Sequence, residues 1–182
     1  MKVFWLNIVG NCGEMCTFTD VYYNNVNMVQ FLGNIEAKTD SKGRVFLPAV
    51  FRKQLQTAAE EKLVLRKDVY QPCLVLYPES VWFATQTQLR NRLNRWNAHQ
   101  QAIFRQFVSD AEVVIPDGNG RILLPKRLQQ LVGIKNDVRF IGVDDTIEIW
   151  AKEIADEPFL NAEEFSSALE SILGKEENQE EF

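Results

Sequence analysis

Alternating apolar and polar residues divide most of the chain into short strands separated by turns. A period of two over about four to eight residues is typical of a half-buried strand. Two groups of strands each contain a short helical segment that begins at a proline, where the missing N–H costs nothing. These predicted helices are 48–55 and 125–131. The predicted strands are 34–38, 44–47, 62–66, 73–77, 112–115, 121–124, 137–141 and 146–150.

Helical spacing predicts a longer helical segment between the two groups of strands. It begins at Glu79 or Ser80, and we expect a break near Asn97 that divides it into two helices. Apolar residues form one stripe in each part. The stripes are Val81, Trp82, Leu89, Leu93 and Trp96, then Ile103, Phe104, Phe107 and Val108. A counterpart helix is predicted after the second group, over 162–172.

The two groups of strands are copies of one unit. Residues 40–48 read DSKGRVFLP and residues 117–125 read DGNGRILLP, so Asp, Gly, Arg, Leu and Pro recur 77 positions later. A repeat of this length indicates a duplicated supersecondary unit. Because neither copy is large enough to bury its apolar face alone, we expect the two halves to pack together. The predicted fold class is α+β.

The start of each copy has the chemistry of a tight turn. The side chains of Asp40 and Asp117 can accept hydrogen bonds from backbone amides two residues on, while Gly43 and Gly120 supply a positive φ. These four residues are therefore predicted to structure the turns.

A turn does not require an arginine after its glycine, so Arg44 and Arg121 need a separate explanation. Each can form an ion pair with the aspartate of its own turn, or each can contact DNA, where the guanidinium fork matches guanine O6 and N7. Basic residues lie around both turns, and in the first copy their clustering favours DNA phosphates as the partner. They are Lys38, Lys42, Arg44, Arg52 and Lys53 in the first copy, and Arg121, Lys126 and Arg127 in the second.

The helical segment 85–109 carries four arginines and no acidic residue. They are Arg90, Arg92, Arg95 and Arg105. We prefer a solvated helix face as the interpretation, and contact with a DNA backbone or an acidic partner as the alternative.

Charge and composition exclude several classes of protein. The net charge is −5, of which residues 1–27 carry −1 and residues 175–182 carry −3, so residues 28–174 are close to neutral. No apolar run approaches the roughly 18 residues needed to cross a bilayer. The lone His99 has no nucleophile signature beside it, so we predict no catalytic residues, no metal site, no cofactor and no small-molecule substrate.

Residues 1–27 differ from the rest of the chain. They show no sustained period, and they do not end in the small-residue cleavage site of a signal peptide. We interpret them as a poorly ordered extension, with translation from upstream of the natural start as one explanation. An odd number of cysteines, Cys12, Cys16 and Cys73, fits a reducing cytosol and does not provide a zinc ligand set.

From about residue 28 to residue 172 the chain resembles the MraZ proteins, bacterial regulators within the wider AbrB-like swapped-hairpin group. The resemblance is carried by three segments. They are DSKGR at 40–44 followed by Leu47, Pro48 and Arg52; CLVLYP at 73–78; and DGNGR at 117–121 followed by Leu124 and Pro125. Two such turns on either side of a helical segment are specific to that family.

The resemblance implies a ring-shaped homo-oligomer whose turns face double-stranded DNA. It implies binding to short direct repeats upstream of the protein's own operon, in the division and cell-wall gene cluster. Carried over by position, Arg44 and Arg121 would be the main DNA contacts, supported by Lys42, Lys38 and Arg52. Lys42 differs from its counterpart Asn119, so the two turns need not contribute equally.

These observations lead to one expected organisation. Two AbrB-like modules, 28–104 with its helices and 105–173 with a C-terminal helix, pack as one pseudo-two-fold β-barrel, and 174–182 form an acidic disordered tail. We expect a cytoplasmic, nucleoid-associated regulator that is not an enzyme and does not contact membranes. The alternative function is a protein-interaction or assembly module whose basic turns bind an acidic partner.

Overall fold

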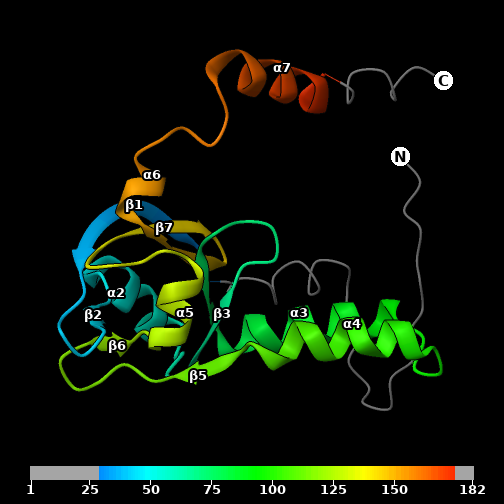
Figure 1. Cartoon of the computed structure of the whole chain (residues 1–182), viewed down its shortest axis with the longest axis horizontal. Helices are drawn as coiled ribbons and strands as arrows, with labels where there is room; N and C mark the ends of the chain where they lie inside the picture. Colours follow the sequence, from blue (N-terminus) through cyan, green and yellow to red (C-terminus); the bar gives the residue numbers. More distant parts are fainter. Residues whose placement is uncertain (1–28, 175–182) are drawn as a thin grey trace, which may run out of the picture.

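The computed structural model describes residues 29–174, which form an α+β fold (Figure 1). The strands are β1 (Phe31–Lys38), β2 (Arg44–Phe46), β3 (Leu63–Lys67), β4 (Leu74–Pro78), β5 (Glu112–Val114), β6 (Arg121–Leu123), β7 (Asp137–Asp144) and β8 (Thr146–Ala151). The helices are α2 (Ala49–Thr57), α3 (Glu79–Arg92), α4 (Ala98–Ser109), α5 (Lys126–Leu131), α6 (Lys152–Ala155) and α7 (Ala162–Leu173). The expectations for residues 1–27 and for the tail after residue 174 lie outside the described residues.

Strands from one half of the chain pair with strands from the other half. Six antiparallel strands lie in the order β1-β7-β8-β4-β3-β5, and β2 pairs with β6 in a separate two-stranded ribbon. The first strand of each repeat therefore pairs with the third strand of the other: β1 with β7, and β5 with β3. The ribbon also takes one strand from each half. Both the six-stranded sheet and the two-stranded ribbon therefore contain strands from both halves of the chain.

The barrel that we expected from the sequence is not closed among residues 29–174. Strand β1 lies at one edge of the six-stranded sheet and β5 at the other. The strands β2 and β6, which follow them in the chain, leave the sheet to pair with each other. No described strand therefore joins the two edges.

A large apolar core with side chains from both halves holds the two halves together. Alternate residues point inward, as in β2 and β6, where Val45 and Ile122 are fully buried. The helices that follow these strands contribute Phe51 from α2 and Leu128 from α5, both 0% exposed. All four belong to the same cluster of buried side chains. The expected packing of the halves against each other is therefore confirmed.

The helical segment between the halves is interrupted at residues 93–97, so the break predicted near Asn97 is confirmed. Helix α3 ends at Arg92, and Leu93 is extended, with φ −106° and ψ 138°. Asn97 is the last residue of this break and caps α4, because its side chain accepts a hydrogen bond from the backbone N–H of Gln100 at 3.1 Å. We call α3, the break and α4 (residues 79–109) the arm, which extends away from the sheets (Figure 1).

The apolar stripes predicted for the arm do not form a continuous buried face. Trp82 is buried and stacks on Phe107, with ring centroids 5.4 Å apart. Trp96 is 96% exposed and Ile103 is 44% exposed. The sheets do not extend under the outer part of the arm, so the apolar residues there have no surface to pack on. Helical periodicity alone therefore predicted more burial than the structure has. No helix of residues 29–174 is both long and apolar enough to cross a membrane.

Candidate nucleic-acid interface

Each repeated turn is held by the carboxylate of its own aspartate. Oδ1 of Asp40 accepts hydrogen bonds from the backbone N–H groups of Lys42 and Arg44, both at 2.9 Å. The backbone N–H of Gly43 donates to the carbonyl of Asp40 at 2.9 Å, and φ of Gly43 is +81°. These hydrogen bonds and the positive φ hold residues 40–44 in a tight turn.

The second turn repeats this geometry. Oδ1 of Asp117 accepts from the backbone N–H groups of Asn119 and Arg121, again both at 2.9 Å. The N–H of Gly120 donates to the carbonyl of Asp117 at 2.7 Å, and φ of Gly120 is +77°. The duplication thus extends to individual hydrogen bonds.

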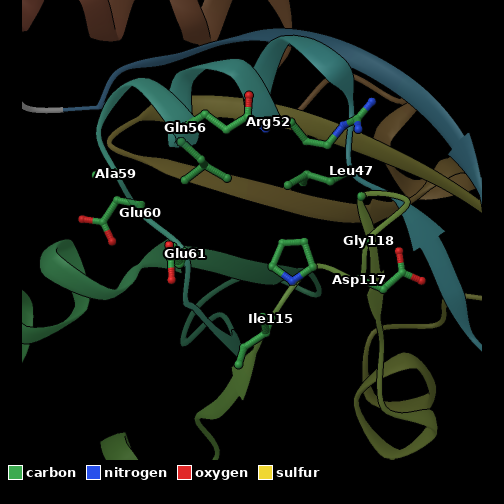
Figure 2. A pocket seen from close by; sticks show the side chains of 12 residues that line it. Leu47, Arg52, Gln56, Ala59, Glu60, Glu61, Ile115, Asp117 and Gly118 are labelled. Atoms are coloured by element: carbon green, nitrogen blue, oxygen red, sulfur yellow. The ribbon is translucent and has the colours of Figure 1, made fainter.

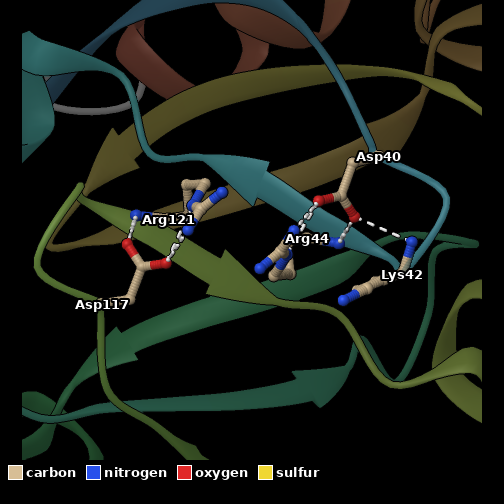
Figure 3. A network of polar contacts seen from close by, with 5 residues as sticks. All are labelled: Asp40, Lys42, Arg44, Asp117 and Arg121. Atoms are coloured by element: carbon tan, nitrogen blue, oxygen red, sulfur yellow. Dashed lines mark hydrogen bonds and ion pairs between the residues drawn. The ribbon is translucent and has the colours of Figure 1, made fainter.

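The arginine of each turn forms an ion pair with the same aspartate (Figure 3). Nε and Nη2 of Arg44 lie 2.7 Å and 2.6 Å from Oδ2 of Asp40. The corresponding distances from Arg121 to Asp117 are 2.8 Å and 2.7 Å. The ion pair that we considered as one explanation of these arginines is therefore present. It does not use Nη1, so donors remain for an outside ligand.

These contacts stabilise the charged form of both aspartates. The backbone hydrogen bond from Arg44, followed by its side-chain hydrogen bond, lowers the pKa of Asp40 to about 2. The same two contacts from Arg121 lower the pKa of Asp117. Both carboxylates are consequently charged at neutral pH, and each guanidinium is held in one orientation.

The ribbon brings the two arginines onto one surface. In its register Arg44 pairs with Leu123, Val45 with Ile122, and Phe46 with Arg121. Cross-strand partners point to the same face of a sheet, and residues two apart do the same. Because the Val45–Ile122 pair is buried, the outer face consists of the other two pairs. The four side chains of this ribbon face are Arg44, Phe46, Arg121 and Leu123.

The ribbon face combines charge with exposed apolar surface. The side chains of Arg44 and Arg121 are 33% and 24% exposed, and Phe46 and Leu123 are 56% and 53% exposed. The guanidinium carbon of Arg121 lies 5.8 Å from the centre of the Phe46 ring. We did not single out Phe46 and Leu123 in the sequence. The alternation after each turn could have identified them, since each lies two positions beyond an arginine and therefore on the same face of its strand.

Each turn is supported by the opposite half of the chain. The carbonyl of Gly43 accepts a hydrogen bond from the N–H of Leu124 at 2.9 Å, and that of Gly120 accepts from Leu47 at 3.0 Å. Under Gly43, Nε2 of Gln129 donates to the carbonyl of Leu124 at 2.6 Å. These bonds across the halves fix the position of one turn relative to the other.

The other predicted DNA contacts lie in different places. Lys42 is exposed on the first turn (Figure 3). Lys38 pairs with Asp137 at 3.1 Å across β1 and β7, with its side chain 80% exposed. Arg52 lies beneath the second turn, because a Cβ added to Gly120 would come within 2.5 Å of its Nη1. The structure therefore brings only Lys42 of these three to the exposed tip of a turn, and places Arg52 as a support.

A cavity of about 590 Å³ lies between α2 and the second turn (Figure 2). Arg52 lines it together with three carboxylates, those of Glu60, Glu61 and Asp117. This charge balance does not favour an anionic ligand. Within residues 29–174, no three histidine, cysteine or acidic side chains are grouped so that they could hold a metal ion.

The comparison with protein families matches both repeats. The family model described as MraZ protein, antitoxin-like, aligns twice, with residues 30–106 and with residues 107–169. The chain belongs to the MraZ family. The resemblance inferred from the two turns is therefore confirmed.

Relatives in the MraZ family share most of their length with the chain. A protein of Phocaeicola vulgatus is 65% identical over 152 residues, which are 84% of this chain and 99% of the relative. A protein of Bacteroides thetaiotaomicron is 62% identical over 153 residues, 84% of this chain and 98% of the relative. One from Christiangramia forsetii is 30% identical over 151 residues, 82% and 97% of the two chains. All three are named transcriptional regulator MraZ, a name that describes a regulator and no enzyme.

Proposed function

We propose that this member of the MraZ family is a sequence-specific DNA-binding transcriptional regulator. It binds short direct repeats upstream of its own operon, in the division and cell-wall gene cluster, and it acts as a ring-like homo-oligomer in the cytoplasm, at the nucleoid. The name shared by the relatives supports the regulatory role. The family resemblance supports the repeats, the ring and the swapped-hairpin modules at 28–104 and 105–173.

The observation that carries the proposal is the ribbon face. A two-stranded antiparallel ribbon fits into the major groove of B-DNA, where base edges are read. Arg44 and Arg121 lie on the exposed side of the ribbon. Backbone hydrogen bonds tie each turn to the opposite half of the chain, and such preorganisation favours specific readout.

The ion pairs are compatible with DNA binding. Each aspartate fixes Nε and Nη2 of its arginine, while Nη1 remains available for a phosphate oxygen or a guanine edge. Lys42 adds an exposed positive charge at the tip of the first turn. Residues 28–174 are nearly neutral overall, so tight binding depends on several ribbon faces acting together in one oligomer.

The apolar half of the ribbon face has a role in the same proposal. The C5-methyl group of thymine is the apolar feature of the major groove, and aromatic or aliphatic side chains contact it. Phe46 and Leu123 lie beside the arginines and are exposed. We therefore assign the arginines to phosphate or guanine contacts and the two apolar residues to thymine methyl groups.

Footprinting of the purified protein on the DNA upstream of its own gene tests the proposal. A regular set of protected direct repeats is expected. Replacing Arg44 and Arg121 by alanine should cost about 1–3 kcal/mol per contact, summed over the oligomer. The matched control is Lys135→Ala, which removes an exposed positive charge outside the ribbon. Unchanged binding by the double arginine variant would show that the ribbon face is not the DNA contact.

A protein-interaction module is the second candidate, with an acidic protein as the ligand of the turns. Two observations favour it: each arginine already pairs with a carboxylate, and the family description includes the term antitoxin-like. Binding to footprinted and scrambled duplexes over a range of salt concentrations separates the candidates. A regulator should prefer the footprinted duplex at every salt concentration, whereas a module that recognises acidic surfaces should not distinguish the two.

A further inference from the structure

Helix α7 has an apolar face that nothing in residues 29–174 covers. Its N-terminus is capped by Asn161, whose side chain accepts from the N–H of Glu164 at 2.9 Å. Phe165, Leu169 and Ile172 follow at spacings of four and three residues, so they lie on one face of the helix. They are 56%, 44% and 68% exposed. No residue of α7 is buried.

A helix of this kind requires a surface to pack on. Isolated helices shorter than about 12–15 residues are marginal in water, and most helices in proteins are stabilised by packing of an apolar face. Contiguous exposed apolar residues also mark interaction sites in soluble proteins. Helix α7 has 12 residues and a strongly apolar face, so its stability depends on a partner.

The outer part of the arm is the complementary surface. Trp96, at the break between α3 and α4, is 96% exposed. Two arginines close to it in the chain, Arg92 and Arg95, are exposed as well. Neither forms an ion pair within the part of the chain that the structure describes. Tryptophan and arginine are the residue types most enriched where binding energy concentrates in protein interfaces.

The charges of the two surfaces are opposite. Residues 161–174 contain Glu163, Glu164 and Glu170 and no basic residue. The arm from residue 85 to residue 109 contains four arginines and no acidic residue. Such complementarity steers encounter and fixes the register of an interface. A nucleic acid or an anionic membrane would be repelled by α7, so these charges favour the arm as its partner.

We propose that α7 of one copy docks on the outer arm of a second copy of this chain. Within one chain, α7 lies apart from the arm (Figure 1). The segment leading to α7 is held on the sheet, because Phe159 packs on Trp150 with ring centroids 4.8 Å apart. Each copy offers one α7 and one arm, so the contact repeats from head to tail and closes into a ring when the rotation permits. This inference rests on the self-association included in the proposed function and identifies the surfaces that produce it.

Charge reversal on each surface provides the test. One variant carries Glu163→Arg and Glu164→Arg on α7, and the other carries Arg92→Glu and Arg95→Glu on the arm. Mass is measured by light scattering after size-exclusion chromatography of the full chain. Each variant alone should lose self-association by more than about tenfold, because like charges then face each other. Mixed in equal amounts, the two should assemble again, since each reversed surface finds a complementary partner on the other variant. Lys135→Glu is the control for a charge change elsewhere.

The outcomes separate this inference from the DNA-binding proposal. A parent protein that is monomeric at micromolar concentration, reversed variants that assemble like the parent, or a mixture that does not recover would each overturn the docking of α7 on the arm. Circular dichroism checks that both variants are folded, and all four changed residues are exposed. Recovery of assembly without any binding to the upstream DNA would instead contradict the proposed function and leave the docking intact.

Discussion

Replacing Gly43 by alanine should destabilise the first turn through two separate effects. An alanine at φ +81° costs about 1–2 kcal/mol, of which about 0.4–1 kcal/mol is recovered because the unfolded chain loses freedom. The new Cβ would also lie 2.6 Å from Nε2 of Gln129 and 3.0 Å from the carbonyl oxygen of Leu124. The amide must move away and lose its bond to that carbonyl, which contributes about 1 kcal/mol. The expected total is about 2 kcal/mol.

The equivalent change at Gly120 is the matched comparison. Its φ of +77° gives the same backbone cost, but its new Cβ would meet only the side chain of Arg52, at 2.5 Å from Nη1. That long side chain can move toward the adjoining cavity, and its Nε makes no hydrogen bond with residues 29–174 that would be lost. We therefore expect Gly120→Ala to cost about 1 kcal/mol, roughly half the cost of Gly43→Ala.

Thermal unfolding monitored by circular dichroism measures the difference. For a domain of this size about 1 kcal/mol corresponds to roughly 2–4 °C in Tm. The Tm of Gly43→Ala should therefore lie a few degrees below that of Gly120→Ala, and both should lie below the parent. Equal Tm values, or the opposite order, would refute the argument that Gln129 is a rigid support and Arg52 a movable one.

Three further predictions concern the ribbon, the turns and the core. Substituting deoxyuridine for thymine within the footprint should weaken binding by the parent but not by a Phe46→Ala/Leu123→Ala variant, as measured by gel shift; equal losses in both would exclude methyl contacts. The charged Asp40 should stabilise the folded state fully above its ordinary pKa of 3.8, and this stabilisation should disappear as the pH falls through about 2. The stabilisation from Asp117 should depend on pH in the same direction. The Tm of the parent relative to Asp40→Asn, followed from pH 7 to pH 2, checks this, and a difference lost already near pH 5 would contradict it. Phe51→Ala should cost about 3–5 kcal/mol in denaturant unfolding, because the ring is fully buried edge-on against Phe31; a cost below about 1 kcal/mol would mean that this part of the core collapses into the space.

The turns could be predicted from the sequence because their chemistry is local. Asp40 contacts Lys42 and Arg44, two and four residues away, and no other part of the chain is needed to make those bonds. Similarly short patterns predicted the order of strands within each repeat and the starts of α2 and α5 after a proline. The duplication was also visible in a nine-residue motif. The arginines were ambiguous at this level, and the structure shows that the ion pair forms and still leaves donors free.

Partners distant in the chain could not be predicted in this way. Alternation makes each strand half-buried but does not specify its neighbour, so nothing local reveals that β1 pairs with β7 or that β2 pairs with β6. The position of Arg52 beneath Gly120 and the exposure of Trp96 depend on the same long-range packing. Short-range hydrogen bonding and turn propensity are therefore encoded residue by residue. The pairing that places Arg44 and Arg121 on one face arises only when the two halves bury a common core.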